Sequence, residues 1–420
     1  MKINLFIKYA CTNCGLCFKS DKKINFKENI ISKLNDKDFI NYCPGIGINR
    51  KKIILDTKNS TALFGNLVSN YVGYSKNKTQ RETSSSGGVL TEIVCYLLEN
   101  KIVDAVCVPM PTDETEVNHS YKFCNLNNLK EIRKYAQSIY VKIPAYGIVE
   151  KIKKFNGKLA FIGLPDQISS LRVISFQQNF QNKIKFFLGP MVGILMEKEV
   201  INMVKILSSS RNKILKLRWR YGEWPGKLLV KFKDKELSID KFYYNYLLPF
   251  FCSNESLVQD DFYNELADIS IGDAWLPEYE NIGKGWSLIQ SKTYKGDKLL
   301  RDMIKKKKIS LEKINDRKAL RMHEHMIDFK KRGSKYRKKI LNFFSIPTPK
   351  DYGFKLKYSY IRYSIELFIL SVIFICKTKL ARYLMSKINQ KILGLLFSKL
   401  RIIWKTLTKN IKRKGLYDNF

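Results

Sequence analysis

The chain has 420 residues, and its 76 Lys and Arg against 38 Asp and Glu give a formal net charge of +38. Hydrophobic residues make up 45% and aromatic residues 13%, which excludes a disordered or collagen-like chain. The length predicts two or three domains. The positive charge would attract phosphate, an acidic membrane surface or acidic redox partners, although a lysine-rich solvated surface accounts for it equally well.

Residues 1–60 are rich in Cys and Lys and carry few large apolar side chains. This composition predicts a small module that a cofactor organises, because an independent apolar core is not available. The chain has nine Cys, and an odd number with four in the first 43 residues argues against a disulfide framework. The first residues also lack the apolar stretch and cleavage site of a secretion signal. We therefore expect a reducing, cytoplasmic setting.

Three of these cysteines form a C-x2-C-x2-C run, and a remote Cys-Pro pair follows it. This spacing is typical of a 4Fe-4S cluster, and Gly15 eases the tight turns within the run. Asp21 stands where a two-cluster ferredoxin has the Cys that serves its second cluster. One cluster is then expected, and the alternative is a zinc site of four thiolates, although structural zinc sites usually present two C-x2-4-C pairs. The expected ligands are Cys11, Cys14, Cys17 and Cys43.

Residues 61–345 alternate short apolar runs with helical patterns, which predicts an α+β or α/β core. The clearest apolar runs are residues 103–108, 158–162, 185–188 and 269–272. No helix-turn-helix, zinc-finger or RNA-recognition signature accompanies the basic residues, so nucleic acid is not an expected partner. The three histidines show no spacing typical of a metal or catalytic site, and we expect them to be solvated or structural.

Two segments of this core carry signals of a binding site. Residues 84–88, Ser-Ser-Ser-Gly-Gly, directly precede a helical pattern, which is typical of an anion or flavin site but also of an ordinary turn and cap. Residues 161–167 predict a strand, a turn and a helix start, the place where ligands bind in open α/β sheets. Asp166 there, and Asp273 after a buried run, could face a ligand or cap the next element.

Residues 346–420 predict a basic amphipathic helical tail, because residues 351–420 hold 15 Lys and Arg against 3 Asp and Glu. Its most apolar run, residues 365–376, contains Glu366 and falls short of the about 20 residues that a membrane-spanning helix needs. The following residues have apolar side chains at helical spacing with basic residues on the other face, as interfacial helices do. The tail is expected either to bind the acidic surface on the inner face of a membrane or to pack on the body of the protein.

Eight motifs follow one another along the chain: CTNCGLC, YCPG, SSSGGVLTEIVCYLLENKIVDAV, KYAQSIYV, FIGLPDQISSLR, RWRYGEWPG, ELADISIGDAW and GKGWSLI. In this order they resemble the beta subunit family of coenzyme F420 hydrogenase/dehydrogenase, over residues 11 to about 300. The resemblance implies a ferredoxin-like 4Fe-4S module at residues 1–60 and a flavin-binding core at residues 61–345. It divides that core into parts at residues 61–140 and 141–345, with the helical tail after it.

The resemblance also implies a function. Family members are iron–sulfur flavoproteins that move electrons between a two-electron carrier and a one-electron cluster. It implies a cluster on the four cysteines, FAD as prosthetic group, coenzyme F420, a nicotinamide or ferredoxin as electron donor, and a redox partner protein or small carrier. Relatives from surface-polysaccharide gene neighbourhoods extend this to a role in polysaccharide biosynthesis. The residues implied for the flavin or deazaflavin pocket are Ser86, Gly87, Gly88, Gln137, Ser138, Gly163, Pro165, Gln167 and Asp273.

Three positions that carry Cys in the family pattern carry other residues here. The family commonly has Gly-Thr-Pro-Cys-Gln where Asp166 replaces the Cys, and it has a Cys pair where Ser256 and Gln259 stand. These changes leave an alternative from another class of protein. The chain would then be a non-redox binding or scaffold protein that keeps the cluster as a structural element and lies peripherally on a membrane.

Overall fold

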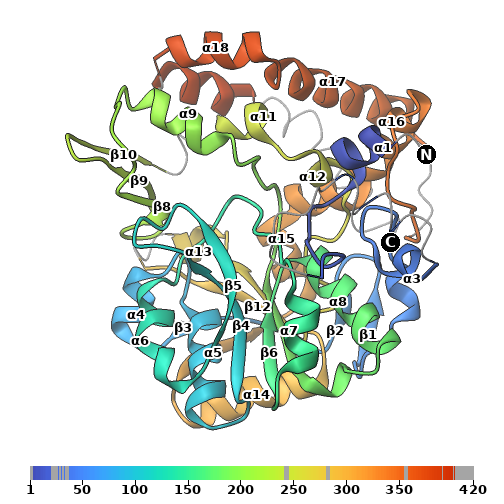
Figure 1. Cartoon of the computed structure of the whole chain (residues 1–420), viewed down its shortest axis with the longest axis vertical. Helices are drawn as coiled ribbons and strands as arrows, with labels where there is room; N and C mark the ends of the chain where they lie inside the picture. The colour runs from blue at the N-terminus through green and yellow to red at the C-terminus, as the bar shows by residue number, and fades with distance from the viewer. Residues whose placement is uncertain are drawn as a thin grey trace.

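The computed structural model describes residues 3–19, 27, 30, 33, 37–240, 246–280, 284–353, 358–389, 391–400 and 402. Its centre is an eight-stranded mixed sheet with strand order β13-β3-β12-β11-β7-β6-β4-β5 (Figure 1). The fold is therefore mixed α/β, as the alternating sequence pattern predicts. In chain order the strands are β3 (Ser69–Ser75), β4 (Ala105–Pro111), β5 (His119–Cys124), β6 (Leu159–Ile162), β7 (Ile184–Pro190), β11 (Ile269–Asp273), β12 (Ser287–Ser291) and β13 (Ile309–Ile314).

The middle of the sheet is parallel. β4 pairs with β6, β6 with β7 and β7 with β11 in parallel, whereas the remaining pairs are antiparallel. Parallel strands are covered on both faces and read as continuous apolar runs, and all four residues of β6 are buried. The four apolar runs of the core sequence correspond to these parallel strands. Their carboxyl ends therefore share one edge of the sheet.

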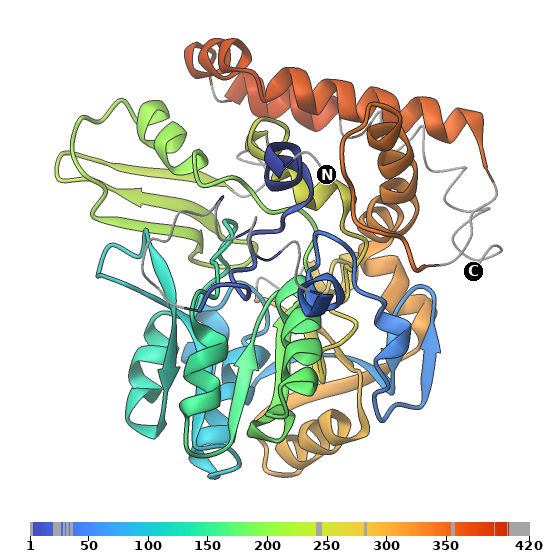
Figure 2. The same cartoon turned by 45° about the vertical axis from the view of Figure 1, so that its right-hand side comes forward.

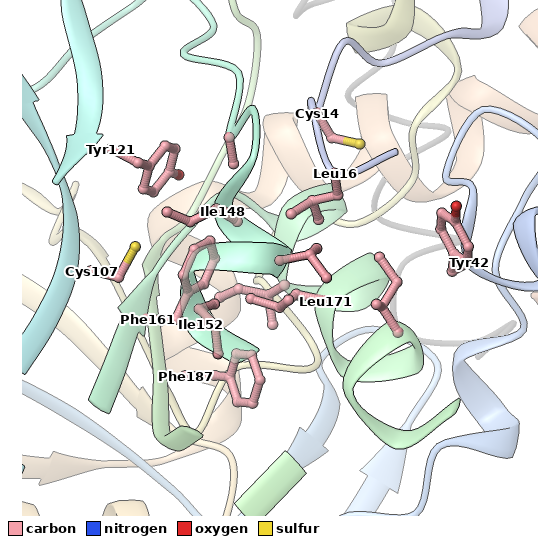
Figure 3. Packing of buried hydrophobic residues seen from close by; sticks show 14 of the residues in the cluster. Cys14, Leu16, Tyr42, Cys107, Tyr121, Ile148, Ile152, Phe161, Leu171 and Phe187 are labelled. Carbon is pink, nitrogen blue, oxygen red and sulfur yellow. The ribbon is translucent and has the colours of Figure 1, made fainter. Parts of the chain in front are cut away.

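Helices cover both faces of this sheet. α5 (Val89–Glu99), α6 (Leu129–Lys134) and α14 (Tyr294–Lys305) pack on one face, and α7 (Ile148–Lys154) and α8 (Pro165–Gln177) on the other. Successive strand side chains point to opposite faces, so Val106 packs with α5 while the adjacent Cys107 packs with α7 and α8. Figure 3 shows the hydrophobic cluster on the α7 and α8 side of the sheet, and Leu16 of the N-terminal segment is part of this cluster. The N-terminal segment and the sheet thus share one core.

A second, three-stranded antiparallel sheet lies apart from the first (Figure 1). Its strands are β8 (Lys216–Tyr221), β9 (Lys227–Lys231) and β10 (Glu236–Asp240), and they pack with α9 (Val200–Leu207) and α11 (Leu247–Phe251). A short hairpin is formed by β1 (Asn59–Thr61) and β2 (Gly65–Leu67). The shorter elements are α1 (Ile3–Leu5), η1 (Phe6–Ala10), α3 (Lys37–Tyr42), η2 (Arg50–Lys52), α4 (Lys78–Thr83), η3 (Leu126–Asn128), η4 (Gln181–Lys183), α12 (Asn254–Val258) and α13 (Pro277–Glu280).

The C-terminal helices cross the top of the molecule in Figures 1 and 2. α15 (Asp316–Ile327), the π-helical η5 (Asp328–Gly333) and α16 (Ser334–Phe343) lead to α17 (Tyr360–Cys376) and α18 (Lys379–Lys387). We call α17, α18 and residues 391–400 the roof. Among the described residues, no helix is both long enough and apolar enough to span a membrane.

A buried ionic network fixes the roof to the body. Arg337 of α16 contacts Glu366 of α17 at 2.5 Å, and Arg362 of α17 contacts both Glu366 at 2.7 Å and Asp328 at 2.8 Å. All four side chains are fully buried. The carboxylate that interrupts the apolar run of the tail is therefore the link by which α17 packs on the protein.

Lys330 of η5 predicts a pH dependence of stability. Burial, reinforced by the nearby charge of Arg337, lowers the Lys330 pKa from 10.5 to about 8, and its Nζ donates to the carbonyl of Ser256 at 3.1 Å. Between these two pH values only the unfolded chain holds the proton, so the contribution of Lys330 to stability rises with pH. We expect the unfolding free energy of the wild type minus that of Lys330→Met to rise from pH 8 to 10.5, as urea titrations would show. A constant difference across that window would contradict it.

Candidate functional site

Four cysteines from two chain segments line one small cavity of about 20 Å³. Cys11 follows η1, where its N–H donates to the carbonyl of Phe6 at 2.8 Å, and Cys14 and Cys17 lie on the loop after it. Cys43 follows α3, and its N–H donates to the carbonyl of Phe39 at 2.9 Å. Two helix ends thus bring the C-x2-C-x2-C run and the remote Cys-Pro pair to the same place.

Two glycines allow the close packing of these segments. Gly15 has φ +83°, and a Cβ there would lie 2.6 Å from the backbone nitrogen of Ala145. The Ala145 N–H donates to the carbonyl of Cys14 at 2.8 Å, which ties the cysteine loop to the core. A Cβ on Gly45, in the turn after Cys43, would lie 2.8 Å from the carbonyl oxygen of Ala10. Side chains at these two positions would push the cysteine segments apart.

The thiols are costly to ionise in the absence of a positive centre. Burial raises the pKa of Cys11 to about 12 and that of Cys14 to about 11. Burial, together with the neighbouring sulfurs, also raises the pKa of Cys17 and Cys43. Four thiolates this close need a cation or a cluster to offset their mutual repulsion.

A buried hydroxyl completes the lining of the cysteine cavity. The Oγ of Ser170, from α8, is buried without a hydrogen-bond partner among the described residues. It could donate to an inorganic sulfide or a cysteine sulfur. The donor set therefore fits a 4Fe-4S cluster. Within the described residues, no three His, Cys, Asp or Glu side chains are arranged to hold a single metal ion.

A second cavity, of about 1400 Å³, lies at the carboxyl ends of the parallel strands. Residues from the ends of β4, β6, β7 and β11 line it, and this is where open α/β sheets bind ligands. The loop before α5 lines another side, and the roof closes the top. Most residues of the implied pocket line this one cavity, namely Ser86, Gly88, Gln137, Ser138, Gly163, Gln167 and Asp273.

Gly87 and Pro165 lie beside this cavity rather than on its wall. The Gly87 N–H donates to the Ser287 Oγ at 3.0 Å, and its carbonyl accepts from Ser75, so this residue joins the loop to the sheet. Pro165 is the first residue of α8, where its fixed φ favours helix initiation. Both residues shape the wall through neighbouring residues.

Asp273 is held by other protein groups. The Arg220 guanidinium binds its carboxylate through two contacts, at 2.7 and 3.1 Å, and the indole nitrogen of Trp224 donates to it at 3.1 Å. Arg220 is buried and also lines the cavity. No role for this arginine is apparent from the sequence. Its only signal there is the alternation of basic and aromatic residues in the motif RWRYGEWPG, which cannot by itself pair the arginine with Asp273.

Gln167 of α8 connects the two cavities. Its Nε2 donates to the carbonyl of Ile143 at 2.8 Å and lies 3.5 Å from the carbonyl of Cys14. Its Oε1 accepts from the Tyr121 hydroxyl at 2.7 Å and from the Leu164 N–H at 3.0 Å. One turn further along α8, Ser170 faces the cysteines. The start of α8 is therefore the shared wall between the cysteine site and the larger cavity.

Two family models match the sequence, and both describe the beta subunit of coenzyme F420 hydrogenase/dehydrogenase. The model of its N-terminal part matches residues 70–150, and the model of its C-terminal part matches residues 156–317. The chain belongs to the coenzyme F420 hydrogenase/dehydrogenase beta subunit family. The matched segments contain the strand ends and loops that line the larger cavity below the roof. The roof and α16 lie beyond residue 317 and thus outside both segments.

Named relatives share modest identity with this family member. The chain is 27% identical over 258 residues to the coenzyme F420-dependent sulfite reductase of Methanocaldococcus jannaschii, which covers 56% of this chain and 37% of that protein. It is 23% identical over 267 residues to the coenzyme F420 hydrogenase subunit beta of Methanococcus voltae, covering 60% of this chain and 87% of that one. The matched part thus spans little more than a third of the sulfite reductase.

The fold is similar to a chain of the F420-reducing [NiFe] hydrogenase complex from Methanosarcina barkeri, whose structure was determined with xenon derivatization. The TM-score is 0.54 at 17% sequence identity, covering 72% of this chain and 100% of that chain. This likeness shows the fold.

The three positions where the family has Cys carry polar contacts, and two of these contacts lie next to the expected cluster cysteines. The Lys142 Nζ contacts the Asp166 Oδ2 at 2.5 Å, beside Cys14. The Ser256 Oγ accepts from the Leu195 N–H at 3.0 Å. The Gln259 Nε2 donates at 3.1 Å to the carbonyl of Pro44, next to Cys43. Hydrogen bonds and an ion pair hold these positions in place.

Replacing Gln167 by Leu is expected to destabilise the wall between the cavities. The change leaves the Leu164 N–H, the Ile143 carbonyl and the Tyr121 hydroxyl without this partner in a buried setting. Each costs about 1–3 kcal/mol, so we expect a total loss of about 3 kcal/mol or more in urea unfolding. Gln178→Leu, at the exposed end of the same helix, is the matched control and should change stability by less than about 0.5 kcal/mol. Equal effects of the two variants would contradict the bridging role.

Proposed function

We propose that the chain is an iron–sulfur oxidoreductase subunit. It passes electrons between one 4Fe-4S cluster, on Cys11, Cys14, Cys17 and Cys43, and a two-electron carrier of flavin or deazaflavin type in the larger cavity. The observation that carries this proposal is the shared wall. A single side chain, Gln167, lines the larger cavity and reaches the backbone of Cys14 at 3.5 Å.

Several features of the larger cavity support a nucleotide-type carrier. Its volume of about 1400 Å³ exceeds the about 300–1000 Å³ of pockets that hold drug-sized ligands. The loop of residues 84–88 enters α5, an 11-residue helix whose N-terminus favours an anionic group. Gly88, with φ +75°, lets this loop turn into the helix. FAD is the proposed prosthetic group, with coenzyme F420, a nicotinamide or ferredoxin as proposed donor.

The chain's own residues position these groups. A bound flavin exchanges hydride with a two-electron carrier and single electrons with a cluster. The protein shields the cysteine site from water, and the Ser170 hydroxyl is available there as a hydrogen-bond donor. Arg220 is positive at the cavity wall, although Asp273 neutralises much of its charge. Gln167 keeps the wall between the two sites rigid through its four hydrogen-bond contacts.

A redox partner protein or a small electron carrier follows from the same proposal. One named relative is a hydrogenase subunit, which supports a protein partner for this chain as well. The role in surface-polysaccharide biosynthesis and the cytoplasmic setting stay predictions of the sequence. Peripheral contact with an acidic membrane surface is supported by the exposed apolar side chains of the roof.

Electron entry can be tested on the anaerobically purified protein. Reduced F420, NADPH and reduced ferredoxin are each mixed with it, and loss of the cluster's visible absorbance is followed by stopped flow. We expect at least one carrier to reduce the cluster. Ser138→Trp should block a small carrier by narrowing the cavity while leaving reduction by dithionite intact. A cluster that dithionite reduces but no carrier does would favour the scaffold alternative.

A further inference from the structure

The larger cavity has two chemically different halves. Its lower half is formed by the strand ends and by polar residues such as Ser86, Gln137 and Ser138. Its upper half is mostly apolar and is lined by Tyr246, Leu248, Ile365, Ile369, Val372 and Phe397, four of them from the roof, which also contributes Ser364 and Ser398. The nucleotide-type group proposed above accounts for the polar half. The apolar half needs a different occupant.

The roof helix α17 buries its charged side chains and exposes apolar ones, the opposite of an ordinary surface helix. Arg362 and Glu366 are its only charged residues, and both are fully buried against the body of the protein. Its outward-facing side chains are mostly apolar, with Ile361 68%, Phe368 65% and Ile375 64% exposed, and the short side chains of Ser364 and Ser371 are exposed among them. A helix on the surface of a globular protein normally exposes its charged face to water. The exposed apolar face of α17 therefore favours an apolar environment around the outer side of this helix.

The exposed apolar surface continues beyond α17. Large apolar side chains are exposed along α18 and residues 391–400, among them Leu380, Leu384, Ile392 and Leu395. Residues 367–402 contain seven Lys and Arg and no Asp or Glu. Apolar side chains flanked only by basic ones complement the surface of a bilayer with acidic lipids.

Phe368 joins this surface to the cavity. It is exposed on the outer side of α17 and also lines the cavity, as does Ser364 one turn earlier. The opening of the apolar half therefore lies within the exposed apolar surface. A molecule at a lipid surface would meet this opening without crossing water.

We infer that the apolar half of the cavity holds the aliphatic chain of an amphiphilic substrate taken from an acidic lipid surface. The polar end of that substrate then reaches the strand ends. This inference rests on the proposed function, because it names the substrate class of the same site. The roof lies outside both family-matched segments, whereas Tyr246 and Leu248 lie within the second of them, so most of the lining of the apolar half belongs to the part of the protein that those segments do not include.

Photolabelling of the full-length protein tests this inference. The probe is palmitic acid with a diazirine in its chain, presented in phosphatidylcholine vesicles with or without phosphatidylglycerol, or as free monomer. We expect cross-links to the cavity-lining residues Ile365, Ile369, Val372 and Leu248, and more of them from acidic vesicles. Labels confined to outward residues such as Leu380 and Leu384 would overturn the inference, as would equal labelling from all three sources.

Two matched variants on α17 sharpen the test. Val372→Trp fills the cavity from its roof, whereas Ile375→Trp adds the same side chain three residues later, outside the cavity. Each displaced methylene costs about fourfold in affinity, so we expect Val372→Trp to lower cavity labelling about tenfold or more. Ile375→Trp should leave it unchanged, and an equal response of both variants would overturn the inference. If Val372→Trp fails to fold, the cross-link map of the wild type decides.

The photolabelling experiment and the electron-transfer experiment can each give a negative result without the other. A protein that carriers reduce but that shows no cavity labelling would refute the chain-binding inference alone. A protein that labels within the cavity while no carrier reduces its cluster would refute the proposed electron transfer alone.

Discussion

The Cys43→Ser variant is expected to lose its iron, from about four atoms per chain to near zero. Cys43 is the one expected ligand outside the C-x2-C-x2-C run, and it closes the site from the end of α3. Three thiolates on a single loop hold a cluster far less well, and cluster binding is coupled to the folding of the segments that bind it. The thermal unfolding midpoint should fall together with the iron content. Anaerobic iron and sulfide analysis and thermal unfolding measure both.

The matched control for this variant is Cys95→Ser. Cys95 is equally buried but lies in α5, on the opposite face of the main sheet. We expect the control to keep its iron and its visible absorbance, with only a modest loss of stability. A Cys43→Ser protein that retained full iron would show that this residue is not a ligand.

The second large effect is expected at the roof. Glu366→Ala removes the carboxylate that contacts Arg337 at 2.5 Å and Arg362 at 2.7 Å, and it leaves two buried guanidinium groups with fewer partners. Breaking a buried ion pair in this way costs about 3–5 kcal/mol. We expect a loss of this size in urea unfolding, with faster hydrogen exchange in α17 than in the sheet.

An exposed ion pair supplies the control for the roof variant. Lys227 and Asp240 lie 3.6 Å apart on the smaller sheet, and both side chains are 57% exposed. Exposed pairs contribute about 0–1 kcal/mol, so Asp240→Asn should leave stability nearly unchanged. Similar losses in Glu366→Ala and Asp240→Asn would mean that the buried network does not hold the roof in place.

Local sequence patterns predicted the α/β class and grouped the four cysteines. The apolar runs at residues 103–108, 158–162, 185–188 and 269–272 became β4, β6, β7 and β11, because a parallel strand buried on both faces leaves a continuous apolar signal. The spacing of the cysteines likewise indicates which of them lie close together in the fold. Cys43 and the run that ends at Cys17 line one cavity, as the Cys-Pro rule predicts.

The rest depends on contacts between distant segments, which have no local signature. Arg220 and Asp273 are 53 residues apart in sequence and meet only when β8 and β11 are placed. Glu366 predicted an interrupted apolar helix, and its pair with Arg362 is local to α17, but Arg337 and Asp328 join these two residues only because α16 and η5 pack against α17. The lone glutamate therefore could not reveal that the tail covers a cavity. Gly87 and Pro165 belong to local motifs, and only the packed structure shows that they lie beside the cavity wall.

The most direct test of the proposed cluster and its four proposed ligands is metal analysis of the wild-type protein after anaerobic purification. Iron and acid-labile sulfide are quantified, and the sample is examined by electron paramagnetic resonance after reduction with dithionite. Four thiolates around one cubane predict about four iron and four sulfide per chain and a paramagnetic signal on reduction. A folded protein that contains zinc in place of iron, or neither metal, would contradict it.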